Sequence, residues 1–119
     1  MNFTKKAAVF AAIFALNAAL PAVAHTTIQS SNIENGAALT EAPTVFEFSF
    51  GSAVGLAALE LETLSGQAVA LSFDPPRGMK KDFSVSLPEL ASDTYVFKWR
   101  AVAKDGHVMK GEVSFTLSD

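Results

Sequence analysis

The sequence predicts an all-β protein: a Greek-key, immunoglobulin-like β-sandwich of about seven strands, after a cleaved N-terminal signal peptide. Three observations support the sandwich. Apolar and polar residues alternate strictly in several short segments after residue 24, as in strands with one buried face. Turn-forming residues separate these segments at the spacing of a sandwich. No helical periodicity of useful length follows residue 24, which argues against a mixed α/β fold.

The first 24 residues have the three parts of a secretory signal peptide. A pair of lysines precedes the apolar run Ala7–Leu20, and Ala22-Val23-Ala24 follows as a small-residue cleavage site. A membrane anchor or a buried helix is the alternative, but the run is shorter than the roughly 20 apolar residues that a membrane span needs. We therefore expect residues 1–24 to be removed, residues 25–119 to form one domain, and the protein to be periplasmic.

Each predicted strand is an alternating segment bounded by turn or loop residues. In chain order, the expected strands are Thr26–Ser30, Val45–Phe50, Leu59–Thr63, Val69–Phe73, Asp82–Leu87, Thr94–Ala103 and Val108–Leu117. Ser65-Gly66 and Asp105-Gly106 are turn signals between neighbouring strands. Asp74–Gly78 is expected to be a loop, because its two prolines cannot donate to a strand ladder.

The alternation also predicts which side chains face the core. Most of the phenylalanines fall on apolar strand faces, where packing is a better interpretation than a cofactor-binding stripe. The expected inward set comprises Phe46, Phe48, Phe50, Phe83, Val85, Leu87, Tyr95, Phe97, Trp99, Ala101, Val113, Phe115 and Leu117. Glu60 and Glu62 are expected to face solvent. Tyr95 lies near the start of its strand, where a tyrosine corner would tie down a Greek-key connection.

The composition excludes several classes of function. Without its leader the chain keeps seven basic and twelve acidic residues, a formal charge of −5. Nucleic acid and anionic lipid require basic patches, so we expect neither as a partner. The mature part has no second apolar stretch of membrane length, so we expect no membrane insertion. The chain has no cysteine, which excludes disulfides, zinc fingers, iron–sulfur clusters and thioredoxin-like chemistry.

The two histidines of the chain are candidate metal ligands. Cleavage after Ala24 would make His25 the first residue, with an α-amine and an imidazole that can chelate one metal ion. Nitrogen-rich tetragonal sites favour Cu(II). His107 follows Asp105-Gly106, and this triplet has a simpler interpretation as a hairpin turn with a solvated histidine. The two histidines would meet only if the first strand ran beside this hairpin, which a sandwich permits.

The mature chain resembles the CopC family of periplasmic copper-binding proteins over essentially its whole length. The specific part is Tyr95–His107, with the sequence Y-V-F-K-W-R-A-V-A-K-D-G-H, followed by Gly111 and Phe115. The looser part consists of His25, Ser30, Ser31, Gly36, Pro43 and Phe50. The resemblance implies a Greek-key sandwich that binds one Cu(II) ion through the amine and ring of His25, the carboxylate of Asp105 and the ring of His107. Three nitrogens and one oxygen suit tetragonal Cu(II).

Some features of the family are missing from this chain. Ser52 stands near the position where some members carry a glutamate, Val108 replaces the proline after the motif histidine, and Ile33 replaces a proline near the first glycine. Met79 and Met109 are isolated, whereas a Cu(I) site needs several soft ligands together. We therefore expect one Cu(II) site and no strong Cu(I) site.

Three functions are compatible with these observations. The first is a periplasmic Cu(II) carrier or buffer in copper homeostasis or resistance, without enzymatic turnover. Its partners would be the copper ion and, in transport, an inner-membrane copper transporter, and the mature chain would be a monomer. The second is a copper oxidase of the histidine-brace type, for which a domain of 95 residues has little room. The third is an immunoglobulin-like adhesion or assembly module whose histidines are incidental.

Overall fold

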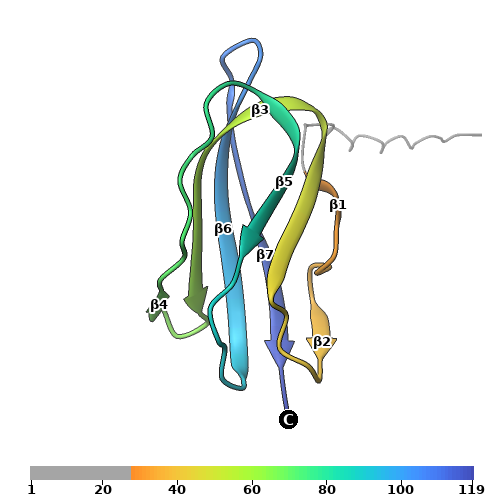
Figure 1. The fold of residues 1–119 in the computed structure, drawn as a ribbon, viewed down its shortest axis with the longest axis vertical. Helices are drawn as coiled ribbons and strands as arrows, with labels where there is room; N and C mark the ends of the chain where they lie inside the picture. The colour runs from red at the N-terminus through yellow and green to blue at the C-terminus, as the bar shows by residue number, and fades with distance from the viewer. Residues whose placement is uncertain (1–27) are drawn as a thin grey trace, which may run out of the picture.

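The computed structural model describes residues 28–119, which form a β-sandwich, so the all-β prediction is confirmed (Figure 1). The strands are β1 (Ile28–Ser31), β2 (Ala37–Leu39), β3 (Val45–Thr63), β4 (Ala68–Val69), β5 (Lys80–Ser86), β6 (Asp93–Ala103) and β7 (Val108–Leu117). The described residues contain no helix with the length and hydrophobicity needed to cross a membrane.

β3 belongs to both layers of the sandwich (Figure 1). Its first part, from Val45, pairs with β1 on one side and β5 on the other. Its second part, from Val54, pairs with β6 and, near its end, with β4. β6 pairs with β7 in a long antiparallel hairpin, and β2 adds in parallel to the far edge of β7. One layer is therefore β1–β3–β5, and the other is β4–β3–β6–β7–β2.

The continuity of β3 corrects the prediction of separate strands at Val45–Phe50 and Leu59–Thr63. Its pairing with β5 jumps between Ser49 and Val54, and its pairing with β6 is irregular after Leu56. Buried positions are even-numbered as far as Leu56 and odd-numbered from Leu59. Extra residues of this kind bend a strand and interrupt its alternation without ending its ladder. The interruption in the pattern therefore marks a bend between the layers and not a loop.

The other strand boundaries differ more modestly. β2 is an additional strand, and its three residues are too few to show an alternation. β4 covers only Ala68–Val69, whereas a strand was expected over Val69–Phe73. The side chains of Val69, Leu71 and Phe73 do pack against the core, but the backbone after Val69 forms no ladder with the described strands. β1 starts at the first described residue, so Thr26 and Thr27 lie outside the described range.

The predicted core is confirmed. Every member of the expected inward set is buried except Leu87, which is half-buried. The rings of Phe46 and Phe97 stack across the two layers with centroids 4.0 Å apart, and Phe50 meets Trp99 edge to face at 5.2 Å. Such aromatic pairs add to the free energy that burial alone contributes. The phenylalanines therefore join the two layers.

The predicted tyrosine corner is also present. The hydroxyl of Tyr95 donates a hydrogen bond of 2.6 Å to the carbonyl of Ala91, in the connection that precedes β6. Burial, and then the nearby carboxylate of Asp93, raise the pKa of Tyr95, so the phenol keeps its proton and remains a donor. This bond fixes the connection from β5 to the start of β6.

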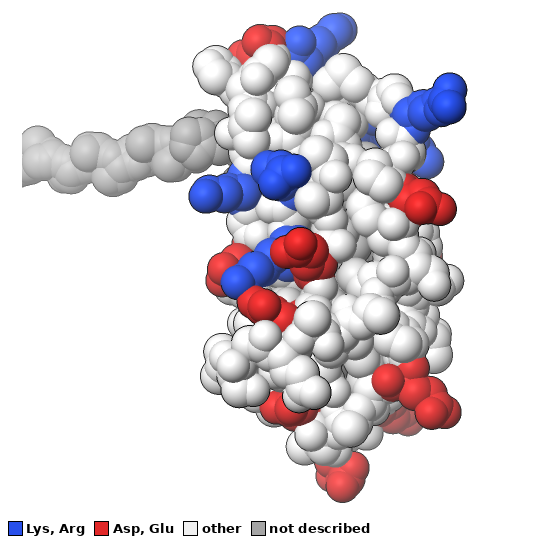
Figure 2. Space-filling view, turned by 90° about the vertical axis from the view of Figure 1, so that its left-hand side faces the viewer, with Lys and Arg blue, Asp and Glu red and all other residues white. Residues whose placement is uncertain are grey.

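Charge is distributed unevenly along the sandwich (Figure 2). On the face shown, Lys and Arg side chains lie in the upper and middle parts, and only Asp and Glu lie at the lower end. Near the middle of the second layer, Lys98 on β6 pairs with Glu62 on β3, and Glu60 is exposed. This face therefore lacks the continuous basic patch that nucleic acid requires.

We expect Gly111→Ala to destabilise the fold, because β7 passes directly over the ring of Trp99 at this point. A Cβ at position 111 would lie 2.7 Å from Cζ2 and 2.9 Å from Cε2 of that ring, which is only 5% exposed and has little room to move. Overpacking of this kind lowers the free energy of unfolding by about 1–3 kcal/mol. Urea denaturation measures the loss.

Gly55→Ala is the matched control, because the nearest atom to a Cβ there is the carbonyl oxygen of Val102 at 3.9 Å. Its unfolding midpoint should change little. Equal midpoints for the two variants would show that the contact between Gly111 and Trp99 is not tight in solution.

Candidate metal centre

The hairpin of β6 and β7 presents two of the predicted ligands at one end of the sandwich. Its ladder runs without a register shift from Asp93 opposite Leu117 to Val102 opposite Val108. Ala103 then donates to the carbonyl of His107 at 2.8 Å, and Gly106 donates to the carbonyl of Ala103 at 2.9 Å. Gly106 has a φ of +93°, a conformation that favours glycine. The expected Asp105-Gly106 turn is therefore confirmed.

Asp105 and His107 contact each other through two hydrogen bonds. Nδ1 of the His107 ring lies 2.8 Å from Oδ2 of Asp105, and the backbone N–H of His107 donates to Oδ1 at 3.1 Å. The side chains are 64% and 83% exposed, respectively. Both groups are thus held together by local geometry alone, at the surface, where an ion can reach them.

Hydrogen bonding keeps the Asp105 carboxylate ionised. The backbone N–H of His107, and then its ring, hold the pKa of Asp105 below its usual value. An ionised carboxylate only accepts hydrogen bonds, so Nδ1 carries the proton that joins the two side chains. The pair therefore combines a negative oxygen with an imidazole that can offer a nitrogen to a metal, either Nε2 directly or Nδ1 after its proton moves to Nε2.

The third predicted ligand, His25, lies outside the described residues. Residues 28–119 contain no cluster of three or more His, Cys, Asp or Glu side chains arranged to hold a metal. The described part of the chain thus brings together two of the three expected ligand residues. The hydrogen bond between these two residues was not expected, although their spacing on either side of the turn glycine was a signal for it.

The start of β1 points toward the same end of the sandwich. β1 is antiparallel to the first part of β3, and β6 is antiparallel to its second part, after the bend. β1 and β7 therefore run in the same direction, away from the end that carries the β6–β7 turn (Figure 1). The N-terminal end of β1, at Ile28, is therefore its end nearer that turn.

The two methionines lie in different environments. Met109 on β7 is half-buried and packs against the core, whereas Met79 is 41% exposed just before β5. The expectation that they form no strong Cu(I) site stays a prediction.

Comparisons with known proteins agree with this architecture. A family model described as the CopC domain matches residues 28–118. The crystal structure of CopC from Methylosinus trichosporium OB3b is similar, with 22% identity, a TM-score of 0.66, and coverage of 79% of this chain and 94% of that one. PcoC, a methionine-rich copper resistance protein from Escherichia coli, shares 27% identity with a TM-score of 0.63, over 80% of this chain and 100% of its own. No curated protein sequence matches significantly.

The paired geometry predicts how the Asp105 carboxyl titrates in the metal-free protein. His107→Ala removes the ring donor but keeps the backbone donor, so the pKa of Asp105 should rise only part of the way to its usual value. An NMR titration of the side-chain carboxyl carbon measures this change. Folding lowers the pKa of Asp105, so its hydrogen bonds to His107 stabilise the folded protein above about pH 3.9, the usual pKa of an aspartate. This contribution is lost as the pH falls through the lowered pKa. An unchanged pKa in the variant would show that the ring bond does not form in solution.

Proposed function

This chain belongs to the CopC family, and we propose that it binds one Cu(II) ion at the turn end of the sandwich and acts as a periplasmic copper carrier or buffer. A copper-related function follows from the family. The similarity to PcoC, which is named as a copper resistance protein, supports a role in copper homeostasis or resistance. The oxidation state, the ligands, the single equivalent and the cellular compartment are the parts that we propose.

The observation that carries the proposal is the contact between Asp105 and His107. Two ligand atoms about 2.0 Å from one metal, at right angles to each other, lie about 2.8 Å apart. Nδ1 and Oδ2 are 2.8 Å apart. If the ring proton moves to Nε2 and the two side chains turn slightly, Nδ1 and Oδ2 would offer two adjacent tetragonal ligands to a Cu(II) ion without a change in the backbone of the turn. The amine and ring of His25 would complete a site of three nitrogens and one oxygen.

The position of Ile28 supports the participation of His25. Ile28 lines one groove together with Lys110 and Gly111 on β7. At about 3.3 Å per residue, His107 lies about 10–13 Å further along β7 toward the turn. The three residues before Ile28 span up to about 10 Å when extended, so the side chains of His25 and His107 must supply the rest of the reach, including the width of the groove. Because β1 runs away from the β6–β7 turn, residues that precede Ile28 can extend toward His107.

The proposed ligand set requires that residues 1–24 be removed, because an amine at His25 exists only after cleavage at Ala24. The exposure of Asp105 and His107 suits a carrier, because copper would leave to a partner without any unfolding of the core. In a transport role that partner would be a copper transporter of the inner membrane. The bound copper is cargo, and we propose no turnover.

Mutating a residue that only supports a metal ligand lowers metal affinity by up to about 100-fold. His25→Ala and His107→Ala each remove a proposed ligand, so we expect each to weaken Cu(II) binding by at least about 100-fold. Competition against a chelator of known affinity measures the effect. Asp105→Asn should also weaken binding, because it keeps the turn propensity but removes the charge.

Asp93→Asn is the matched control, since it makes the same change at the opposite end of β6. Its affinity should equal that of the unmodified protein. Retention of full affinity by both histidine variants would show that the ligand assignment is wrong.

A further expected outcome concerns the terminal chelate and pH. One additional residue before His25 separates the α-amine from the ring and should lower Cu(II) affinity while leaving the fold intact. Imidazoles titrate near pH ~6.5 and α-amines near pH ~7.7–8.0, so acidification should weaken binding steeply, with more than one proton taken up per copper released. Chelator competition at a series of pH values measures both quantities in the two proteins. Identical affinity and proton uptake would mean that the terminal chelate does not exist.

A further inference from the structure

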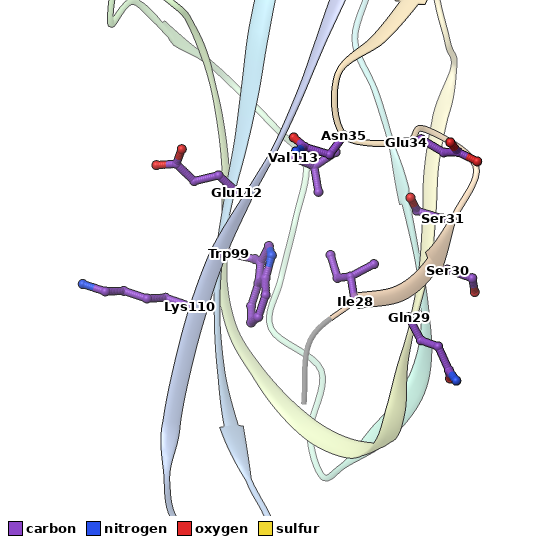
Figure 3. A pocket seen from close by; sticks show the side chains of 11 residues that line it. Ile28, Gln29, Ser30, Ser31, Glu34, Asn35, Trp99, Lys110, Glu112 and Val113 are labelled. Atoms are coloured by element: carbon purple, nitrogen blue, oxygen red, sulfur yellow. The ribbon is translucent and has the colours of Figure 1, made fainter. Parts of the chain in front are cut away.

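Asn35 attaches the connection between β1 and β2 to the edge of β7. Its side chain lies in the wall of the groove between β1 and β7 (Figure 3). Oδ1 of Asn35 accepts the backbone N–H of Ser114 at 2.9 Å and the Ser114 hydroxyl at 3.2 Å. The next residue, Gly36, donates its N–H to the carbonyl of Ser114 at 2.7 Å. β2 then begins at Ala37, opposite Phe115. The carboxamide of Asn35 thus takes the place of a backbone acceptor just before the ladder of β2 starts.

The same two residues form the sequence in which an asparagine most readily loses its amide. The backbone nitrogen of Gly36 can attack Cγ of Asn35, because glycine has no side chain to block the approach. The Gly36 nitrogen gives up its proton, a C–N bond forms, and the side-chain amino group leaves with that proton as ammonia. Water then opens the resulting succinimide at either carbonyl, which gives aspartate or isoaspartate. Both residues are exposed, so water reaches this site.

The contacts with Ser114 oppose this reaction in the folded protein. The Gly36 nitrogen must give up its proton to attack, and this proton is engaged in the hydrogen bond to the Ser114 carbonyl. Cγ of Asn35 must move onto that nitrogen, but two hydrogen bonds to Oδ1 restrain the side chain. The backbone of Gly36 is held with a φ of +86° directly before a paired strand. Ring closure therefore requires that the connection first separate from β7.

We propose that Asn35–Gly36 is a succinimide-forming site, which the folded protein keeps unreactive through Ser114 and which unfolding activates. This inference goes beyond the copper function and does not depend on it. In the unfolded chain neither reacting group is bound to Ser114, so the ring closes as it does in an open peptide. Loss of ammonia is irreversible, so the reaction removes unfolded molecules from the folding equilibrium.

The two products differ in how well they can refold. Aspartate at position 35 keeps an oxygen in the place of Oδ1 and can again accept from Ser114. Isoaspartate routes the main chain through the former side chain and adds a methylene group directly before β2. This extra carbon displaces the N–H of Gly36 from the Ser114 carbonyl and disturbs the register of Ala37 opposite Phe115. Isoaspartate at position 35 should therefore weaken the pairing of β2 with β7.

Peptide mapping by mass spectrometry tests the site. The protein is held in mildly alkaline buffer, folded or unfolded in urea, and the loss of the Asn35 amide is followed over time. The rate should be at least about tenfold higher in urea, because folded molecules react only through the small population that has opened. Asn32 is the internal control, since the branched side chain of Ile33 hinders attack by the following nitrogen. Equal rates at Asn35 in the two samples, or equal loss at Asn32 and Asn35 in urea, would overturn the proposal.

The role of Ser114 is tested in the folded protein. Ser114→Pro removes both donors to Oδ1 of Asn35 but no donor to β6, because the Ser114 N–H points to Asn35. It should raise the rate of amide loss at Asn35, and Ser114→Ala, which removes only the hydroxyl, should raise it less. Rates in both folded variants that equal the rate of the unmodified chain would show that Ser114 does not restrain the reaction.

Asn35→Asp separates the effect of this site from other damage in urea. An ionised carboxylate resists attack far better than a carboxamide, and it keeps the acceptors for Ser114, so this variant should fold and form little isoaspartate. After a long hold in urea and refolding, the unmodified chain should contain a fraction that unfolds at lower urea concentration, and the variant should not. Fluorescence of Trp99, the single tryptophan of the chain, follows the unfolding. An equally large weakened fraction in both chains, or isoaspartate at position 35 without any weakened fraction, would overturn the proposed effect on β2.

Discussion

The crossing of β3 between the two layers is the constraint on which the rest of the structure depends. Its first part sets the register of β1 and β5, and its second part sets the register of β4 and β6. The two layers are packed together by aromatic side chains, above all Phe46 on β3 stacked on Phe97 on β6. The chain has no cysteine, so this shared strand and its core perform the joining that disulfides perform in many small exported domains.

The same crossing sets the direction of β1 relative to the β6–β7 turn. Because β3 reverses direction at its bend, β1 and β7 run in parallel, and the entry to β1 faces the β6–β7 turn. The regular ladder of the hairpin then fixes the distance along β6 and β7 between Trp99 and the turn that carries Asp105 and His107. The proposed metal chemistry therefore needs no dedicated loop, only a tight turn and the beginning of a strand.

Sequence patterns predicted those parts of the fold that depend on one buried face. Tyr95, Phe97 and Trp99 alternate without interruption, and all three are buried as expected. The pattern failed where extra residues shift the phase of β3 after Leu56, since alternation cannot distinguish a bulge from a loop. β2 escaped prediction because three residues carry too little pattern, and its pairing with β7 depends on contacts distant in sequence.

The candidate site was predictable to a different degree. Residue types and family resemblance identified Asp105 and His107, and the turn glycine between them explains why they meet. The groove between β1 and β7 could not be predicted, because it depends on which strands lie side by side. His25 lies outside the described residues, so its role rests on the direction of β1 and on the chemistry of a terminal histidine.

The most direct test of the account is electron paramagnetic resonance of the mature protein loaded with one equivalent of Cu(II), with and without ¹⁵N labelling of histidine. We predict a tetragonal spectrum with three nitrogen donors, two of them imidazoles. Labelling should change the couplings of all three, because the α-amine also belongs to a histidine. A spectrum with a single imidazole, or with oxygen donors alone, would contradict it.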